Sequence, residues 1–212
     1  MLENLSGEEL KNQFKTNKTL RLVTFIIGGL AAVALGYFIY LQFIWYPTNE
    51  ESKDKYWTGL NLAVADSTDA ALAVLKPVKE KYDGYVGGEI AQFVYARQLM
   101  NKGEYQKAIE DLEGVDVEDT YIALMAIGLK ADCLSEMGKY TEAANLYLEV
   151  ANTVDNDFTT PFYLKKAGIC AEQVKDFKMA AKSYKRIKDE YNQFAQTNKI
   201  DKFYARAKSQ IK

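Results

Sequence analysis

The side chains of this sequence that could take part in catalysis are its paired carboxylates. Such pairs occur at Glu110-Asp111, Glu118-Asp119 and Asp189-Glu190, and two neighbouring carboxylates can serve as a general acid and a general base. Glu110-Asp111 and Asp189-Glu190, however, lie on lysine-bearing segments, and such pairs are typical of the solvated faces of helices. Histidine is absent from the chain, which removes the commonest general base and the commonest metal ligand. We therefore expect no catalytic residue and no metal site.

The composition narrows the class of protein further. The chain has 212 residues and a formal net charge of −2, which is enough for one domain plus an additional segment and provides no basic surface for nucleic acid. The sequence contains no glycine-rich phosphate-binding loop, so we expect neither a cofactor nor a small-molecule substrate. Only three prolines interrupt a chain rich in Ala, Leu, Lys and Glu, and this favours an all-α fold.

A long apolar segment lies near the N-terminus. No charged residue occurs from Leu22 to Asn49, and residues 22–46 are almost entirely apolar. A helix of about 20 apolar residues crosses about 30 Å of hydrocarbon and satisfies its own backbone hydrogen bonds. We therefore predict a transmembrane helix over residues 22–46. A cleaved signal peptide that ends near Ala32-Val33-Ala34 and a buried core helix are the alternatives.

The charges that flank the apolar segment predict its orientation. Residues 11–21 contain four basic residues and no acid, whereas only Lys53 and Lys55 follow soon after the segment, beside three acids. By the positive-inside rule, residues 1–21 form a cytoplasmic tail and residues 47–212 form a domain outside the cytoplasm. In a bacterium, this describes a single-pass protein of the inner membrane with a periplasmic domain.

Three small residues form a stripe along the apolar segment. Gly28, Ala32 and Gly36 are four residues apart, a spacing that places them on one helix face and lets another helix approach closely. We hypothesise that this face packs against a helix of another membrane protein. The alternative is that Gly and Ala are simply frequent in membrane helices.

The rest of the chain contains a repeat that is anchored on alanine. Four alanines, spaced 37, 35 and 37 residues apart, head the copies: Ala71, Ala108, Ala143 and Ala180. Apolar residues follow each alanine at plus four and plus seven, which places them on one face of a helix. A turn with a glycine and an aromatic precedes two of the alanines, at Gly103 and Tyr105 and at Gly138 and Tyr140. Each copy therefore predicts a helical hairpin.

This pattern resembles the tetratricopeptide (TPR) family, whose hairpins stack into a solenoid. Beyond the turn glycines, turn aromatics and second-helix alanines, Ala96 and Ala131 match the small residue of the first helix, and Gly168 takes that place in the copy headed by Ala180. The copies are longer than the family's period of about 34 residues, the closing proline is missing, and the first copy lacks the turn glycine. The resemblance covers residues 50–191 and implies a TPR-like helical-hairpin solenoid within residues 47–212.

Several residues are expected to delimit the helices of the repeats. We interpret Gly87-Gly88 as the separator of the first two copies, and Pro77 is expected to kink or shorten the helix that contains it. Residues 198–212 are strongly basic and predict a C-terminal capping helix that shields the last repeat. Contact of this basic face with anionic lipid or a partner is the alternative. The apolar side of the capping helix would be formed by Ile200, Phe203, Tyr204, Ala207 and Ile211.

The two cysteines, Cys133 and Cys170, occupy the same position in consecutive first helices of the repeat. Neighbouring helix axes lie about 8–10 Å apart, whereas a disulfide needs Cα atoms within about 7 Å. We therefore favour two buried thiols that act as small apolar residues, and a disulfide is the alternative.

The resemblance also implies a binding surface, because the first helices of TPR domains line a groove that holds peptide segments. The alternative for about half of the corresponding residues is packing between repeats. The groove residues implied here are Ile90, Phe93, Arg97, Met100, Met125, Asp132, Ser135, Phe162, Lys165, Ile169 and Glu172.

The complete architecture resembles the YfgM-like family, in which a short cytoplasmic tail and one membrane anchor precede a periplasmic TPR-like domain. These proteins are ancillary subunits of the Sec translocon that work with periplasmic folding factors. The resemblance implies a non-enzymatic scaffold in protein export, with SecYEG and a membrane-anchored periplasmic chaperone or peptidyl-prolyl isomerase as partners. An adaptor in another envelope complex, for cell division, secretion or outer-membrane assembly, is the alternative. An organelle import receptor would require the opposite orientation.

Overall fold

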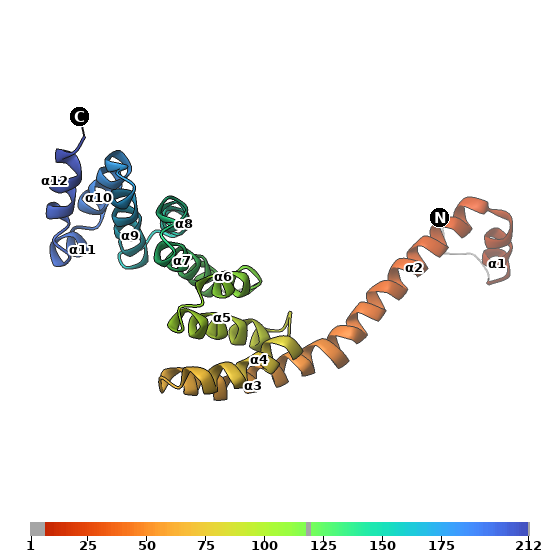
Figure 1. The fold of residues 1–212 in the computed structure, drawn as a ribbon. Helices are drawn as coiled ribbons and strands as arrows, with labels where there is room; N and C mark the ends of the chain where they lie inside the picture. The colour runs from red at the N-terminus through yellow and green to blue at the C-terminus, as the bar shows by residue number, and fades with distance from the viewer. Residues whose placement is uncertain (1–6, 118–119, 212) are drawn as a thin grey trace. The chain divides into compact units, whose positions relative to one another are not determined.

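The structure is a computed structural model that describes residues 7–117 and 120–211, and every regular element within these ranges is a helix (Figure 1). The first six residues of the predicted tail, the pair Glu118-Asp119 and Lys212 lie outside the described residues. The chain divides into two compact units, one ending at Glu50 and the other beginning at Glu51. The expectation of an all-α fold is confirmed for the described part of the chain.

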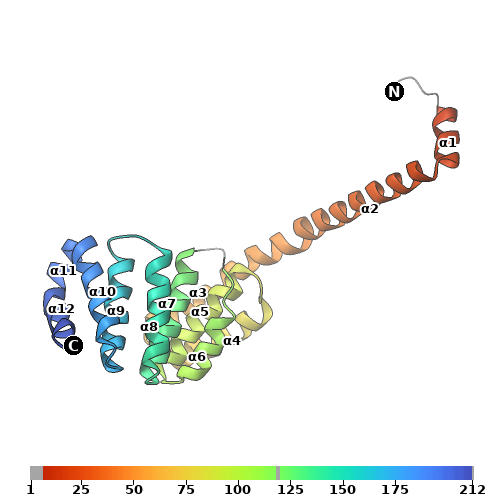
Figure 2. The same ribbon diagram turned by 90° about the horizontal axis from the view of Figure 1, so that it is seen from above.

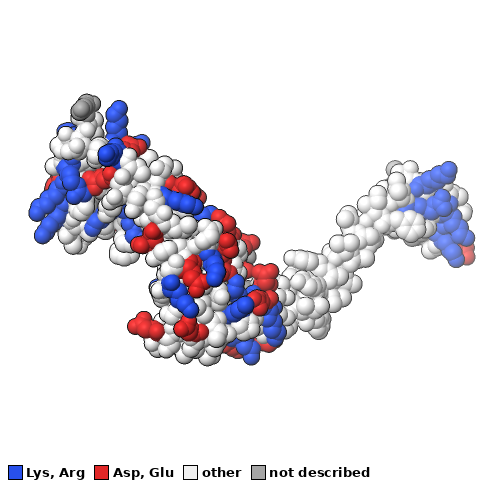
Figure 3. Space-filling view, viewed as in Figure 1, with Lys and Arg blue, Asp and Glu red and all other residues white. Residues whose placement is uncertain are grey.

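The first unit contains the predicted membrane segment. It comprises α1 (Gly7–Thr16), α2 (Lys18–Tyr40), a π-helical turn η1 (Leu41–Trp45) and the first residues of α3 (Tyr46–Val64). The Asn17 side chain caps α2 by accepting a hydrogen bond from the Leu20 backbone N–H at 3.1 Å. None of the residues of α2 is buried, and its surface carries no charge between the basic N-terminal end and η1 (Figure 3). Among the described residues, one helix is therefore long and apolar enough to cross a membrane.

The helix that contains this segment is longer than predicted. It starts at Lys18 rather than Leu22, and the helical backbone continues through Pro47 to Val64. Proline removes a backbone donor and crowds the carbonyl one turn earlier. The π-helical turn η1 ends two residues before Pro47, and such a wider turn accommodates the ring without ending the helix. Pro77 likewise lies inside α4 (Thr68–Lys81), which continues for another turn beyond it.

The second unit consists of helices that pair in sequence order (Figure 2). The last part of α3 and α4 form the first hairpin, and three further hairpins follow. Their helices are α5 (Val86–Asn101) with α6 (Tyr105–Glu113), α7 (Thr120–Glu136) with α8 (Tyr140–Thr153), and α9 (Thr159–Gln173) with α10 (Phe177–Glu190). Each helix from α4 to α10 packs against the next one in the chain, which is the stacking of a TPR-like helical repeat.

The turn within each hairpin has the same geometry in all four copies. The residue five positions before the alanine has a left-handed backbone, with φ of 54° at Asp66, 74° at Gly103, 76° at Gly138 and 61° at Lys175. The following N–H then donates to a carbonyl five residues earlier, as in a Schellman cap. These bonds measure 2.8 to 2.9 Å: Ser67 to Leu62, Glu104 to Leu99, Lys139 to Leu134 and Asp176 to Ala171. The first copy therefore forms the same turn although it lacks the glycine.

The alanines lie where the two helices of each hairpin meet. All four are fully buried, as a close helix crossing requires. The residues four positions later are buried in every copy: Leu75, Leu112, Tyr147 and Tyr184. In the fourth copy, the Tyr184 ring fills the space beside Gly168, where a Cβ would lie 2.5 Å from a ring carbon. The predicted apolar stripe is thus the core of the solenoid.

The interpretation of Gly87-Gly88 as a separator is wrong. Both glycines are buried in the first turn of α5. A Cβ at Gly87 would lie 2.0 Å from the Ser52 backbone oxygen, and one at Gly88 would lie 1.8 Å from the Tyr82 backbone oxygen. The glycines are needed because α5 approaches two other backbone segments closely, not because the chain turns there.

The C-terminal helices cover the last hairpin. A short helix, α11 (Asn192–Thr197), leads into α12 (Ile200–Ser209), which packs against α10. Ile200 and Ala207 are fully buried, so the predicted capping helix is present. Ile211 differs from the prediction because it follows the end of α12 and is 37% exposed.

Polar contacts between repeats join residues about one repeat apart. Lys166 bonds to Asp132, Arg206 bonds to Glu172, and Tyr191 bonds to Asp155, at separations of 34, 34 and 36 residues. Each repeat therefore gains its side-chain partners from its immediate neighbour, as in other solenoids.

Candidate functional site

The first helices α5, α7 and α9 together form a hollow of about 470 Å³ on the surface of the second unit. Met100, Asp132, Ser135 and Ile169, four of the predicted groove residues, line it. The other side chains around it are Asn101, Tyr105, Glu136, Tyr147, Lys166 and Cys170. A hollow lined from three consecutive repeats offers contacts to an extended partner segment.

The centre of this hollow is a charged network around Asp132. Lys166 of α9 donates to both carboxylate oxygens of Asp132, at 2.7 and 3.0 Å, and the Tyr147 hydroxyl donates to the same carboxylate. The Lys166 ammonium also lies over the rings of Tyr147 and Phe162, at 5.4 and 4.7 Å from their centroids. The network ties three helices together and presents a carboxylate and a cation side by side.

Burial keeps the nearby hydroxyl and thiol groups neutral. Desolvation, followed by the hydrogen bond to Asp132, raises the pKa of Tyr147 far above its ordinary value. Desolvation also raises the pKa of Cys170, and it raises the pKa of Cys133 to about 11. A thiol is nucleophilic only as its thiolate, so these groups contribute shape and hydrogen bonds at neutral pH.

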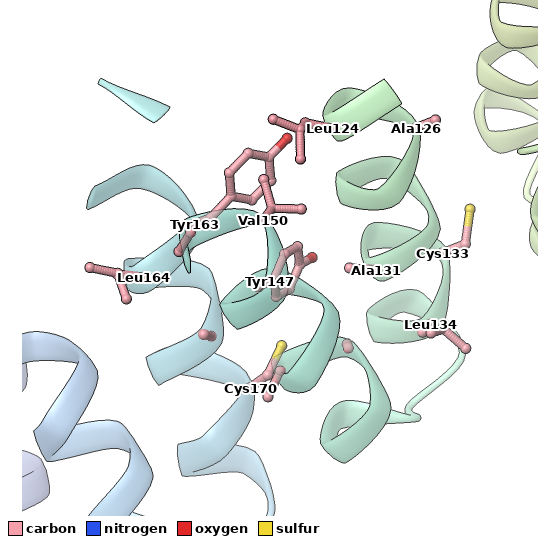
Figure 4. Close-up of a cluster of buried hydrophobic side chains, with 14 of the residues drawn as sticks. Leu124, Ala126, Ala131, Cys133, Leu134, Tyr147, Val150, Tyr163, Leu164 and Cys170 are labelled. Carbon is pink, nitrogen blue, oxygen red and sulfur yellow. The ribbon is translucent and has the colours of Figure 1, made fainter. Parts of the chain in front are cut away.

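Both cysteines are buried free thiols, in agreement with the favoured prediction. Figure 4 shows Cys133 on the side of α7 that faces away from Cys170. The Cys170 sulfur lies 3.6 Å from the Ser135 hydroxyl oxygen.

A second, apolar pocket of about 240 Å³ lies between the N-terminal halves of α7 and α9. It contains two predicted groove residues, Met125 and Phe162. The pocket is lined by Tyr121, Leu124, Met125, Val154, Phe158, Thr159, Phe162 and Tyr163. Tyr163 points toward Leu124 across the space between the helices (Figure 4).

The aromatic rings of this pocket are ordered by their mutual packing. The Phe158 and Phe162 rings are parallel at a centroid distance of 6.4 Å, and Phe162 meets Tyr163 edge to face at 5.3 Å. Phe162 also receives Lys166 on its face, so the apolar pocket and the charged network are neighbours along α9. The surface between α7 and α9 thus changes from apolar to charged over its length.

The remaining predicted groove residues have other surroundings. In α5, Phe93 is 7% exposed and belongs to the core, Ile90 packs against that core, and Arg97 is exposed. In α9, the Lys165 ammonium donates to the Asn198 side chain at 3.0 Å, and Glu172 pairs with Arg206 of α12. The capping segment therefore engages two of the side chains that the resemblance assigned to the groove.

Sequence reasoning missed several side chains of the site. Tyr121 and Phe158 stand just before or at the start of their helices, outside the positions compared between repeats. Lys166 was not singled out and Tyr147 was expected only as part of the apolar stripe, although both bind Asp132. A usable signal existed: Phe158, Phe162 and Lys166 are spaced four residues apart, a spacing that predicts one shared side of a helix.

The predicted packing stripe of the first unit is open in the structure. Gly28, Ala32 and Gly36 are all exposed, and a Cβ at either glycine would meet no atom within 4 Å. Among residues 7–117 and 120–211, no group of three His, Cys, Asp or Glu side chains is arranged to hold a metal ion.

Comparison with known proteins gives similarities to solved structures alone. No family model matches the chain, and no curated protein matches it. Among solved structures, the chain is similar to a crystal structure from Podosopora anserina that is named for the nearly identical TPR-like repeats of a kinesin light chain. The TM-score is 0.47 at 14% sequence identity, and the match covers 76% of this chain and 95% of the other.

Proposed function

We propose that this protein is a membrane-anchored, non-enzymatic scaffold that binds protein partners on the α5, α7 and α9 surface. The observation that carries the proposal is the hollow of about 470 Å³ that three consecutive first helices share. A surface built from several repeats suits an extended protein segment, because each repeat adds one set of contacts.

The anchor comprises residues 22–46, which include α2 from Leu22 onward, η1 and the first residue of α3. Its exposed apolar side chains have no interior to fill within the described part of the chain, and a bilayer would cover them. The four basic residues before it favour a cytoplasmic tail for residues 1–21 and a periplasmic location for residues 47–212. The protein is then a single-pass component of a bacterial inner membrane.

Protease protection tests this orientation. A protease added to spheroplasts should digest residues 47–212 and leave a membrane-protected fragment that contains the tail. In inverted vesicles, the same domain should be protected. Digestion of the domain in inverted vesicles, and not in spheroplasts, would contradict the proposed orientation.

The partners proposed are SecYEG and a membrane-anchored periplasmic chaperone or peptidyl-prolyl isomerase. The support is the resemblance to the YfgM-like family in tail, anchor and repeat domain. The full chain, extracted in mild detergent and analysed by affinity purification with mass spectrometry, should retain SecY and such a folding factor. Recovery of cell-division proteins alone would favour the alternative role as an adaptor of another envelope complex.

The small-residue face of α2 is proposed to dock on a partner's membrane helix. Replacing both Gly28 and Gly36 by Leu adds bulk where no atom lies within 4 Å in this chain, so it should disturb a partner and not the protein itself. We expect at least a fivefold loss of the co-purified membrane partner. Val33→Leu, at a position that is 71% exposed and outside the stripe, is the control. Equal recovery from all three proteins would remove this part of the proposal.

A further inference from the structure

We propose that the apolar pocket between α7 and α9, together with an acidic hollow beside it, binds a basic segment of a partner protein that carries an aromatic or large aliphatic side chain. This inference rests on the proposed scaffold function and states the chemistry of one partner.

The apolar pocket exposes four large side chains to solvent. Tyr121 is 69% exposed, Met125 45%, Phe158 75% and Phe162 39%. Single exposed apolar residues are ordinary, but a contiguous set around an indentation is typical of an interaction site. Aromatic and methionine side chains are also enriched at the centres of protein interfaces. The pocket, at about 240 Å³, is suited to one apolar side chain of a partner rather than to a whole helix.

The acidic hollow, of about 620 Å³, lies on the other side of Phe158 from the apolar pocket. Two carboxylates, Asp157 and Glu190, line it together with the amide side chains of Asn192, Gln193 and Asn198. Carboxylate and amide oxygens accept hydrogen bonds from Lys and Arg. Glu190 already pairs with Arg186 at 2.8 Å on the surface, but an exposed carboxylate has further lone pairs for an incoming cation. Phe158 lines both hollows, so one partner segment can place an apolar and a basic side chain into them.

The charge of the surrounding chain fits the same partner. No Lys or Arg occurs in residues 114–129 or in residues 140–164, which supply the apolar pocket, whereas Asp116, Asp155 and Asp157 lie in the two loops. The two lysines that follow are already paired: Lys166, which lies over the Phe162 ring, binds the Asp132 carboxylate, and Lys165 donates to the Asn198 side chain. The turns within the hairpins, by contrast, contain Lys102, Lys139 and Lys175. Acids around an apolar pocket attract a basic segment. They also repel anionic lipid headgroups, which favours a protein segment over a membrane surface as the occupant.

Binding of defined peptides to the full chain tests the inference. The chain is reconstituted in zwitterionic phosphatidylcholine nanodiscs, and fluorescence anisotropy is measured with a labelled peptide of eight lysines, two phenylalanines and two leucines. Two control peptides replace all lysines by glutamate, or all apolar residues by serine. We expect binding of the first peptide, weakening with added salt, at least tenfold tighter than binding of either control. Empty nanodiscs provide the background.

Matched variants locate the site. The double variant Phe158→Ser with Phe162→Ser should weaken binding at least tenfold, and Asp157→Asn with Glu190→Gln should weaken it severalfold and reduce its salt dependence. Val174→Ser, which removes an apolar side chain that is 43% exposed at the other end of α9, and Glu142→Gln, at an exposed acid of α8, should leave it unchanged. Far-UV circular dichroism confirms that each variant retains its helices.

Several outcomes would overturn the inference. One is equal binding of the glutamate peptide and the lysine peptide, and another is unchanged peptide binding by the Phe158 and Phe162 double variant. A third is that the apolar pocket binds lipid or a second copy of this chain, which would be seen as co-flotation with vesicles or as dimerisation that the double variant abolishes. Affinity purification separates this inference from the scaffold itself. If the double variant still recovers the full set of partners, the pocket assignment fails and the scaffold stands. If the unmodified chain recovers none, the scaffold fails.

Discussion

Replacement of Gly87 by alanine tests the close approach of α5 to α3. An alanine Cβ would lie 2.0 Å from the Ser52 carbonyl oxygen, 2.2 Å from its carbon and 2.7 Å from the Lys53 nitrogen. All three atoms belong to the backbone, so no side-chain rotation relieves the contact. The start of α5 must move away from α3, and the hydrogen bond of 3.0 Å from the Gly87 N–H to the Ser52 hydroxyl is then lost.

The expected loss of stability combines the steric clash of the Cβ with the lost hydrogen bond to Ser52. Overpacking of a tight interior costs about 1–3 kcal/mol, and a lost hydrogen bond at a buried position costs about 1 kcal/mol. We therefore expect Gly87→Ala to lower the free energy of unfolding by about 3 kcal/mol. A glycine in an open linker would behave in the opposite way, since Gly→Ala there stabilises by about 0.5 kcal/mol through the unfolded chain.

Urea unfolding of the full chain in mild detergent, followed by circular dichroism, measures the difference. With a slope of about 2 kcal/mol/M, a loss of about 3 kcal/mol lowers the unfolding midpoint by about 1.5 M. Gly114→Ala is the control, because its Cβ would meet the end of the Gln92 side chain rather than backbone at close range. Loss of the hydrogen bond from Gln92 to the Asp111 carbonyl limits the cost to about 1 kcal/mol, so the midpoint should fall by about 0.5 M at most. An unchanged or higher midpoint for Gly87→Ala would refute the close packing of α5 on α3.

The hairpin turns predict that substitutions at equivalent positions change the free energy of unfolding in opposite directions. Gly138→Ala should lower it by about 1 kcal/mol, because φ is 76° there. Lys175→Gly should stabilise by about 0.5 kcal/mol in the same urea assay, because φ is 61° and glycine avoids the steric cost; equal signs would contradict the shared turn. The pKa of Cys133 is raised from 9.0 to about 11 by burial, so its contribution to stability is complete below pH 9 and is lost as the pH rises through 11. The urea midpoint should therefore fall between pH 8 and pH 10.5, and by less in Cys133→Ala; an equal fall in both proteins would exclude this thiol as a cause. Glu172→Gln should cost about 0.5–1 kcal/mol of stability by weakening the ion pair with Arg206, and the recovery of partners in affinity purification should not change. If partner recovery were lost without any loss of stability, Glu172 would be a groove residue that contacts the partner.

The sequence predicted the hairpins well because their signals are local. The alanine spacing and the apolar stripe depend on the period of a single helix, and all four alanines are buried as expected. The turn glycines at 103 and 138 have the expected left-handed backbone. The first copy was harder to recognise because Asp66 adopts the left-handed conformation without being glycine. Hydrogen bonds of the turn hold that residue in place, and they are not visible in a residue pattern.

The binding surface was predicted less completely. Four of the implied groove residues line the hollow around Asp132 and two line the apolar pocket. Phe93 went into the core, whereas Lys165 and Glu172 bind the capping segment. A repeat position defines the face of a helix, but whether that face is open depends on the next helix in the stack. Phe158 was not predicted because it precedes α9, outside the positions that were compared between the repeats.

The sequence by itself determined the elements: a charge-free helix near the N-terminus, helical hairpins at a spacing of 35 to 37 residues, and a basic helix at the end. These follow from contacts within one helix or one turn, which residue type and period specify directly. Only the tertiary structure decided that Gly87 and Gly88 are points of backbone contact, that Asp132 joins Lys166 and Tyr147, and that Phe158 separates two hollows. Those features depend on distances between helices about one repeat apart, and the packing of whole side chains sets such distances.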